Sequence, residues 1–263
     1  MKRISYLFPD GRRKALTMSY DDGVVEDRKL VEIFNRSGIR GTFHLNSGAF
    51  GWPSHVPAEE VKTLYAGHEV ACHSVSHPFL DHCPAPVILR EMLDDRVNLE
   101  TLVEYPVRGS SYPMGTYHPE AEKLLAAAGI AYARTVKSTG KFNLPDDWLA
   151  WHPSCHHSED LLNRAAAFRQ DRYSFRLLYV WGHAYEFARN NNWELIEQFC
   201  AEMAGLPEIW YATNIEIHDY VEALKRLQFS AACDRVCNPT ALPLWLSVDD
   251  APTAIAPGAL QLL

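Results

Sequence analysis

Short runs of apolar and β-branched residues alternate with longer segments whose apolar positions recur every three or four residues. The first pattern predicts β-strands and the second predicts amphipathic helices. Predicted strands cover residues 14–20, 42–45, 69–72, 107–112, 130–135, 177–181 and 209–212, with 148–151 as a candidate for a further strand. Predicted helices cover residues 26–37, 57–65, 86–103, 119–128, 158–168, 193–204 and 213–227. Thr213, followed three residues later by Glu216, has the pattern of a capping box.

The repeated order of strand and helix predicts parallel strands, and seven or eight such units favour a distorted (β/α) barrel over an open sheet. We expect this barrel to form a catalytic domain over residues 1–228. After it, residues 229–263 show no helical period and contain Asn-Pro and Pro-Gly turns on either side of a short apolar run. We expect this segment to be a small β extension packed on the barrel.

Composition narrows the classes of function. Apolar residues make up 47% of the 263 residues, which is enough for a large core, and the formal charge of −8 argues against a nucleic acid or an anionic membrane as partner. No apolar run approaches the roughly 20 residues that span a bilayer, and the first residues lack the apolar core of a signal peptide. We therefore expect a cytoplasmic protein by default, or a secreted one if a leader has been removed. The six scattered cysteines are expected to be reduced.

Two adjacent carboxylates end the first predicted strand, where Asp21 and Asp22 are followed by Gly23. Neighbouring aspartates repel one another unless a cation or a proton lies between them. The pair therefore favours a metal site in which one carboxylate binds the ion and the other stays free as a base. A solvated Asp-Asp-Gly turn is the alternative that these three residues leave open.

A pair of histidines, His73 and His77, follows the strand predicted at 69–72. Because they are four residues apart, one turn of chain brings both imidazoles to the same side. Together with an aspartate they form an N,N,O set that suits Zn²⁺ or a neighbouring divalent ion. A lone histidine is more often structural, but this pair, in a chain with Asp-Asp-Gly after another strand, favours a metal. We expect His68 to have a supporting or structural role.

These two stretches resemble the first two motifs of a known family. Thr-x-Ser-Tyr-Asp-Asp-Gly at 17–23 and Gly-His-Glu-Val-x-x-His-Ser-x-x-His-Pro at 67–78 look like motifs of the polysaccharide deacetylase (NodB-homology) family, carbohydrate esterase family four. The spacing between the motifs is also similar, and residues 41–45 resemble the family's second strand. The resemblance extends over about residues 14–221 and implies a (β/α) barrel.

The resemblance also implies roles for individual residues. Asp21 matches the catalytic base, and the metal ligands matched are Asp22, His73 and His77. The run 178–183 resembles the final motif, a buried strand that ends in the general acid, which would be His183; a structural histidine is the alternative there. The implied cofactor is a divalent metal, foremost zinc, with cobalt, nickel, iron or manganese as other options.

Two further motifs match more loosely. Residues 108–115 resemble the family's Arg-x-Pro-aromatic-Gly turn, with extra residues between the arginine and the proline. By this match Arg108 would pair with Asp21, unless it is a plain surface arginine. The substrate-binding residues matched are Tyr112, Pro113 and Met114, with the Met114 amide as oxyanion donor. Asp-Asp-Trp at 146–148 resembles the fourth motif, in which Trp148 would form a groove wall unless it packs in the core. The same loop carries His152, His156 and His157, either as a polar loop or as groups that tune His183.

The function implied is metal-dependent hydrolysis of carbon–nitrogen bonds other than peptide bonds, on an acetylated oligosaccharide or polysaccharide. Three alternatives remain. The first is a hydrolase of a small non-sugar amide, such as a cyclic ureide or formamide. The second is an iron oxygenase with two histidines and one carboxylate, which the βα scaffold and the distance between Asp22 and His73 disfavour. The third is a non-catalytic glycan-binding protein. The sequence leaves the oligomeric state open.

Overall fold

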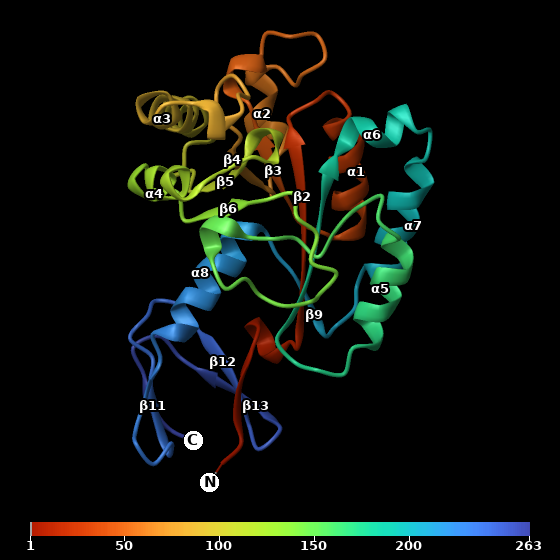
Figure 1. Cartoon of the computed structure of the whole chain (residues 1–263). Coiled ribbons are helices and arrows are strands. Elements are labelled where there is room, and N and C mark those ends of the chain that lie inside the picture. Colours follow the sequence, from red (N-terminus) through yellow and green to blue (C-terminus); the bar gives the residue numbers. More distant parts are fainter. Residues whose placement is uncertain (1) are drawn as a thin grey trace.

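A sheet of eight parallel strands forms the centre of the molecule in the computed structural model, which describes residues 2–263 (Figure 1). Seven of the strands follow the order β6-β5-β4-β3-β2-β8-β7, and β9 pairs with β2. The strands are β2 (Lys14–Asp22), β3 (Gly41–Leu45), β4 (Glu69–Cys72), β5 (Gly109–Ser111), β6 (Tyr132–Arg134), β7 (Cys155–His156), β8 (Arg176–His183) and β9 (Ile209–Tyr211). Strand β2 is buried almost throughout, as expected for a central parallel strand.

The sheet curves until its two ends are joined by an irregular segment. One edge of β2 is paired with β8 from Lys14 to Asp21, while β9 and β3 share the other edge. On the far side, Trp151 bridges β6 through backbone hydrogen bonds with Ala133 and Thr135, and β7 then pairs with β8. The predicted distorted (β/α) barrel is therefore confirmed, and its distortion lies where this short segment replaces a full strand.

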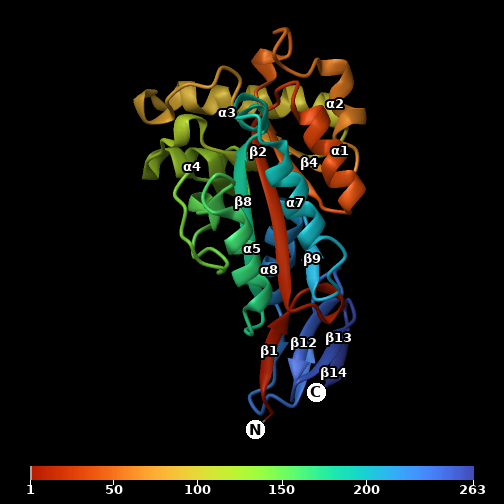
Figure 2. The same ribbon diagram turned by 90° about the vertical axis from the view of Figure 1, so that its right-hand side faces the viewer.

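Helices surround the sheet and bury their apolar faces against it (Figures 1 and 2). They are α1 (Asp27–Ser37), α2 (Ala58–Leu64), α3 (Ala85–Val103), α4 (Pro119–Ala127), α5 (Leu161–Gln170), α6 (Ala184–Arg189), α7 (Trp193–Met203) and α8 (Asn214–Lys225). The capping box of Thr213 and Glu216 is present at the start of α8. Between residues 2 and 263, none of the helices is long and apolar enough to cross a bilayer.

Two details differ from the prediction. Residues 148–150 form a 3-10 helix rather than a strand, because Asp147 caps the Leu149 amide with its carboxylate. The strand in this region is instead the two-residue β7, beside β8. Helix α6 was not predicted, since its six residues are too few to show a helical period.

The last part of the chain folds into two small antiparallel sheets at the end of the barrel opposite the carboxyl ends of its strands (Figures 1 and 2). One sheet has the order β1-β12-β13 and the other β10-β11-β14. These strands are β1 (Ile4–Leu7), β10 (Gln228–Phe229), β11 (Arg235–Cys237), β12 (Leu244–Val248), β13 (Ala251–Ile255) and β14 (Leu260–Leu262). The first strand of the chain thus pairs with the C-terminal segment.

Candidate active site

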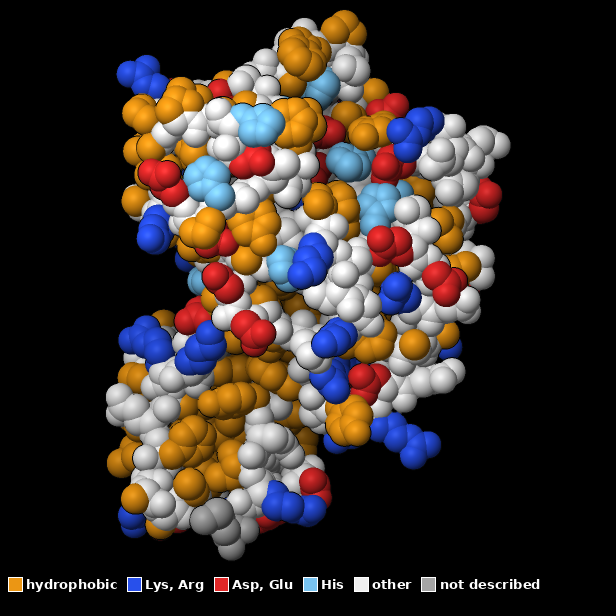
Figure 3. Space-filling view, in the orientation of Figure 1, with side chains coloured by type: hydrophobic (Ala, Val, Ile, Leu, Met, Phe, Trp, Pro, Cys, Tyr) orange, Lys and Arg blue, Asp and Glu red, His pale blue; other side chains and the backbone are white. Residues whose placement is uncertain are grey.

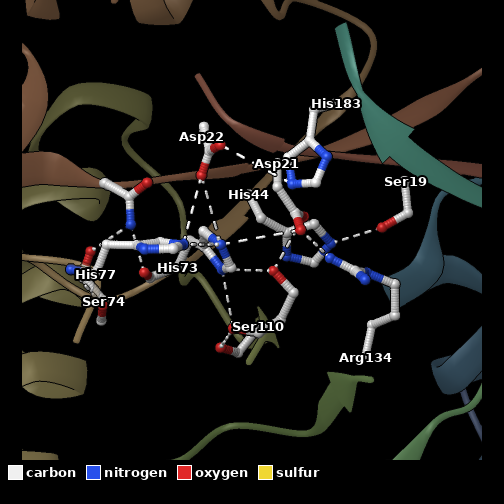
Figure 4. A network of polar contacts seen from close by, with 12 residues as sticks. Ser19, Asp21, Asp22, His44, His73, Ser74, His77, Ser110, Arg134 and His183 are labelled. Atoms are coloured by element: carbon white, nitrogen blue, oxygen red, sulfur yellow. Dashed lines mark hydrogen bonds and ion pairs between the residues drawn. The ribbon is translucent and has the colours of Figure 1, made fainter. Parts of the chain in front are cut away.

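Polar side chains from β2, β4 and β8 meet at the carboxyl ends of these strands (Figure 4). Asp21 lies opposite His183 in the β2–β8 register and opposite His44 in the β2–β3 register. Asp22 follows with a backbone φ of 80°, a left-handed value that ends the alternation of the strand. His73 and His77 enter from the loop after β4. The five residues predicted as base, ligands and acid are therefore brought together.

A donor set suited to a divalent cation is formed by Asp22, His73 and His77. The Nε2 atoms of the two histidines are 3.1 Å apart, and each lies 3.6 Å from Asp22 Oδ1. Burial lowers the pKa of His73 to about 3, so its imidazole is neutral, as metal binding requires. Burial and the neighbouring Asp21 raise the pKa of Asp22. Two imidazoles and a carboxylate packed this closely fit a metal ion with N,N,O ligation.

Groups behind the ligands hold them in place. His73 Nδ1 lies 3.0 Å from the Ser111 carbonyl and 2.7 Å from its hydroxyl oxygen, so Nδ1–H is the donor and Nε2 keeps its lone pair for the ion. Asp95 on α3 accepts the amide N–H groups of His73 and Ser47, at 3.0 and 2.9 Å. Four residues at the site have positive φ values, a strain that persists only where the surroundings fix the backbone: Asp22, Ser74, His77 and Met114.

Asp21 is held apart from the three candidate ligands by its own partners. Arg134, the last residue of β6, forms an ion pair with Asp21 Oδ2, and Ser111 donates its hydroxyl to Oδ1 at 3.1 Å. Burial alone would raise the pKa of Asp21, but the Arg134 guanidinium and nearby imidazoles outweigh it and hold this pKa well below its usual range. Arg134 is fully buried and its guanidinium carbon lies 4.4 Å from the centre of the Trp181 ring. Asp21 is therefore an oriented, ionised carboxylate.

Arg108 does not reach this site. It precedes β5, at the opposite end of the strand from Ser111, and forms an ion pair with Asp219 on α8. Arg134 instead occupies the position expected for Arg108. The sequence carried one signal for Arg134: a lone arginine near the end of an otherwise apolar predicted strand.

The expected substrate-binding residues are divided between the site and other surfaces. Tyr112 and Met114 line the cavity at the candidate metal ligands, whereas Pro113 is buried beside them. Trp148 lies elsewhere, donating from its indole nitrogen to Glu222 on α8 at 2.6 Å. The tryptophan that lines the cavity is Trp181 on β8.

His183 belongs to a second cluster, built around Glu186 on α6. Glu186 Oε2 lies 3.0 Å from His156 Nε2, 3.1 Å from His157 Nε2 and 3.6 Å from His183 Nδ1. Burial would raise the pKa of Glu186, but the three imidazoles hold it well below its usual range. Burial would lower the pKa of His183, yet Glu186 and the two aspartates raise it. Gly182 makes room for this cluster, because a Cβ atom there would lie 2.1 Å from His157 Nδ1.

The remaining histidine of that loop, His152, lies apart from the cluster and contacts the Thr135 hydroxyl at 2.6 Å. His68 is also structural, since its ring accepts the Gly41 amide N–H at 3.0 Å. A buried histidine that the sequence did not single out, His44, lies behind Asp21 and contacts the Ser19 hydroxyl at 2.9 Å (Figure 4). Burial lowers the pKa of His44 to about 3, so it packs as a neutral ring.

A cavity of about 500 Å³ opens at these residues. It is lined by Asp21, Asp22, His73, His77, Tyr112, Met114, Gly115, Val136, Trp181, His183 and Tyr185. The space-filling view shows acidic and histidine side chains together in a hollow in the upper part of the molecule (Figure 3). The cavity is large enough for a small ligand, and aromatic side chains and titratable groups line the same space.

Fold and site together define a distorted (β/α)-barrel protein with an Asp-His-His metal-binding geometry at the carboxyl ends of its strands. The family model described as polysaccharide deacetylase matches residues 9–133, and over this part the chain is similar to that family. The match includes Asp21, Asp22, His73 and His77, whereas Arg134, His183 and Glu186 lie beyond it. No curated protein matches the sequence.

Solved structures share the fold. A putative polysaccharide deacetylase from Mycobacterium smegmatis is 17% identical, with a TM-score of 0.63 over 83% of this chain and 93% of that one. A family 4 carbohydrate esterase from Streptomyces lividans, in complex with acetate, is 14% identical, with a TM-score of 0.51 over 75% and 90%. A CE4 family pseudoenzyme from Bacillus anthracis is 14% identical, with a TM-score of 0.52 over 81% and 67%. This chain also covers 61% of a Streptococcus pyogenes deacetylase.

Proposed function

We propose that this protein is a metal-dependent hydrolase that removes acetyl groups from an N-acetylated or O-acetylated carbohydrate. The observation that supports this most strongly is the separation of roles between two adjacent aspartates. Asp22 faces two imidazoles 3.6 Å away, whereas Asp21 is held by Arg134 and Ser111 outside that donor set. A carboxylate kept free beside a metal site is what a general base requires.

The residues divide the reaction between them. Asp22, His73 and His77 would hold the divalent ion, foremost zinc, which when bound polarises a carbonyl and lowers the pKa of a water molecule. Asp21 accepts the proton of the attacking water. His183 Nε2 lies 4.0 Å from Asp22 Oδ2 and therefore borders the candidate metal site. From this position His183 would donate a proton to the leaving amine or alcohol. Met114, on the cavity wall, offers its backbone amide to the oxyanion.

A substrate panel tests the proposal. The protein loaded with zinc, and separately with cobalt, nickel, iron and manganese, is assayed on acetylated chitooligosaccharides, acetylxylan, and small amides including a cyclic ureide and a formamide. We expect acetate release from at least one acetylated carbohydrate and no turnover of the small amides. Turnover of an amide alone would assign the site to non-sugar hydrolysis. Glycan binding without turnover would assign the protein to a non-catalytic class, and the pseudoenzyme from Bacillus anthracis shows that this fold also occurs in such proteins.

Glu186→Gln is expected to move the alkaline limb of the pH profile. Glu186 helps to raise the pKa of His183, so the general acid stays protonated to higher pH in the wild type. A bound cation lowers the pKa of His183 by its own positive charge, and this effect is the same in the wild type and in Glu186→Gln. Removing the carboxylate charge should therefore shift the fall of kcat/KM to lower pH. The check is the pH dependence of acetate release from pH 5 to 10.

The matched control is Glu202→Gln, a charge change on α7 outside the cavity. It should leave the alkaline limb where the wild type has it. If Glu186→Gln lowers activity by the same factor at every pH, Glu186 supports only the structure of the loop, and its influence on His183 is rejected.

A further inference from the structure

The hydroxyl group of Ser111, the last residue of β5, lies between a candidate metal ligand and the candidate base. Its oxygen is 2.7 Å from His73 Nδ1 and 3.1 Å from Asp21 Oδ1. The side chain is fully buried, and between residues 2 and 263 no other side chain forms hydrogen bonds with both His73 and Asp21. One hydroxyl group therefore connects the two parts of the site.

The direction of these two hydrogen bonds follows from what each group can donate. The Asp21 carboxylate is paired with the buried Arg134 guanidinium, so it only accepts, and the single hydroxyl hydrogen of Ser111 points to Asp21 Oδ1. The hydroxyl oxygen then accepts from the Nδ1–H group of His73, which also lies 3.0 Å from the Ser111 carbonyl oxygen. Two acceptors from one residue thus hold the His73 ring, and its Nε2 keeps the lone pair that a cation needs.

Ser111 lies opposite Arg134 in the register of β5 and β6. The two side chains bind the same carboxylate, since Ser111 contacts Oδ1 of Asp21 and Arg134 contacts Oδ2. The motif that residues 108–115 resemble has its arginine two residues before the proline, and this is the position of Ser111. The contacts with Asp21 are therefore divided between two strands, and the residue on β5 has a second partner in His73.

We propose that Ser111 is a positioning residue that fixes the imidazole of His73 and the carboxylate of Asp21 relative to one another. A general base acts on a water molecule at an ion only if it stays within hydrogen-bond reach of that water, and a misplacement of about 1 Å can lower a rate roughly 100-fold. Because one hydroxyl group contacts both residues, a change at either contact also disturbs the other. This inference rests on the proposed deacetylase function, which makes Asp21 the base and His73 a ligand.

Ser111→Ala tests both contacts. We expect zinc affinity, measured by calorimetry on the metal-free protein, to fall about 10- to 100-fold, the usual effect of removing a hydrogen-bond partner of a metal-bound histidine. At saturating zinc, kcat for tetra-N-acetylchitotetraose should still fall about tenfold with KM unchanged, because Ser111 does not line the cavity. Unchanged zinc affinity and unchanged kcat in this variant would overturn the proposal.

Two further variants separate the hydroxyl group from packing. Ser111→Thr keeps the hydroxyl and should restore most of both losses; a folded Ser111→Thr protein as impaired as Ser111→Ala would overturn the proposal. The matched control is Ser110→Ala, because Ser110 is an equally buried serine of β5 whose hydroxyl contacts the Ser111 carbonyl and neither His73 nor Asp21. It should leave zinc affinity and kcat close to those of the wild type.

The link between the two contacts is tested in Asp21→Asn. The amide oxygen is expected to stay on Arg134, which only donates, so the amide NH₂ group faces Ser111 and its hydroxyl loses its acceptor there. Ser111→Ala should therefore weaken zinc binding by a smaller factor in Asp21→Asn than in the wild type. The same factor in both proteins would overturn the link between base and ligand.

Failure of the proposed function is distinguishable from failure of this inference. If the wild type releases no acetate from any acetylated carbohydrate, the proposed function is rejected, and the zinc affinities of the wild type, the two single variants and the double variant still decide the role of Ser111. If acetate is released and Ser111→Ala changes neither zinc affinity nor kcat, only the role of Ser111 is rejected.

Discussion

Asp21→Asn is expected to lower acetate release by roughly 10²- to 10⁴-fold, the range of a lost general base. The amide keeps the shape of the side chain but cannot accept a proton from water. Because Asp21 contacts Arg134 and Ser111 and lies outside the candidate ligand set, the variant should still bind one equivalent of zinc. Initial rates of acetate release and the zinc content of the purified protein measure the two effects.

Asp27→Asn is a matched control for this change. Asp27 is also fully buried, but burial raises its pKa well above the usual range, so its carboxyl group is neutral and hydrogen-bonded by the Tyr65 hydroxyl at 2.7 Å. Replacing a neutral carboxyl group with an amide outside the cavity should leave acetate release unchanged. Full activity of Asp21→Asn with zinc bound would remove Asp21 from the mechanism.

Arg134→Met is expected to be the most destabilising single change near the site. Arg134 is fully buried, and its loss leaves the buried Asp21 carboxylate unpaired, a change that costs about 3–5 kcal/mol in proteins. Arg108→Met is the contrasting variant, since the ion pair of Arg108 and Asp219 leaves 38% and 39% of their side chains exposed. Such a pair contributes about 0–1 kcal/mol. Urea denaturation of the wild type, Arg134→Met and Arg108→Met gives the loss in the free energy of unfolding for each variant.

The double variant Asp21→Asn/Arg134→Met separates stability from chemistry. It removes both charges, so it should regain much of the stability lost in Arg134→Met while remaining inactive. Arg108→Met should keep both stability and acetate release. An Arg108→Met protein that folds normally but loses activity would restore the role that the family motif implies for Arg108.

The sequence predicted the barrel and the core of the site for clear physical reasons. Each of the predicted helices has an apolar period long enough to identify from the sequence, and parallel strands bring their carboxyl ends to one edge. Residues at the ends of separate strands, such as Asp21, His73 and His183, were therefore expected to meet. The structure places them within contact of one another or of Asp22.

What was missed depends on side-chain direction and on contacts between distant parts of the chain. Arg134 and Arg108 each lie next to or within a short strand, and only the register of β5 and β6 decides which one faces Asp21. Glu186 sits on a helix too short to predict, yet it joins histidines from two different loops. The pairing of strand β1 could not be predicted from the sequence, because its partner strand β12 lies near the other end of the chain.

The most direct measurement of the central claim is a titration of metal-free protein with zinc while acetate release from tetra-N-acetylchitotetraose is followed. The account predicts that activity rises linearly and stops rising at one zinc ion per chain, and that His77→Ala abolishes both zinc binding and acetate release. Acetate release that is already complete without a divalent ion, or zinc bound at one equivalent with no acetate released from any acetylated carbohydrate, would contradict it.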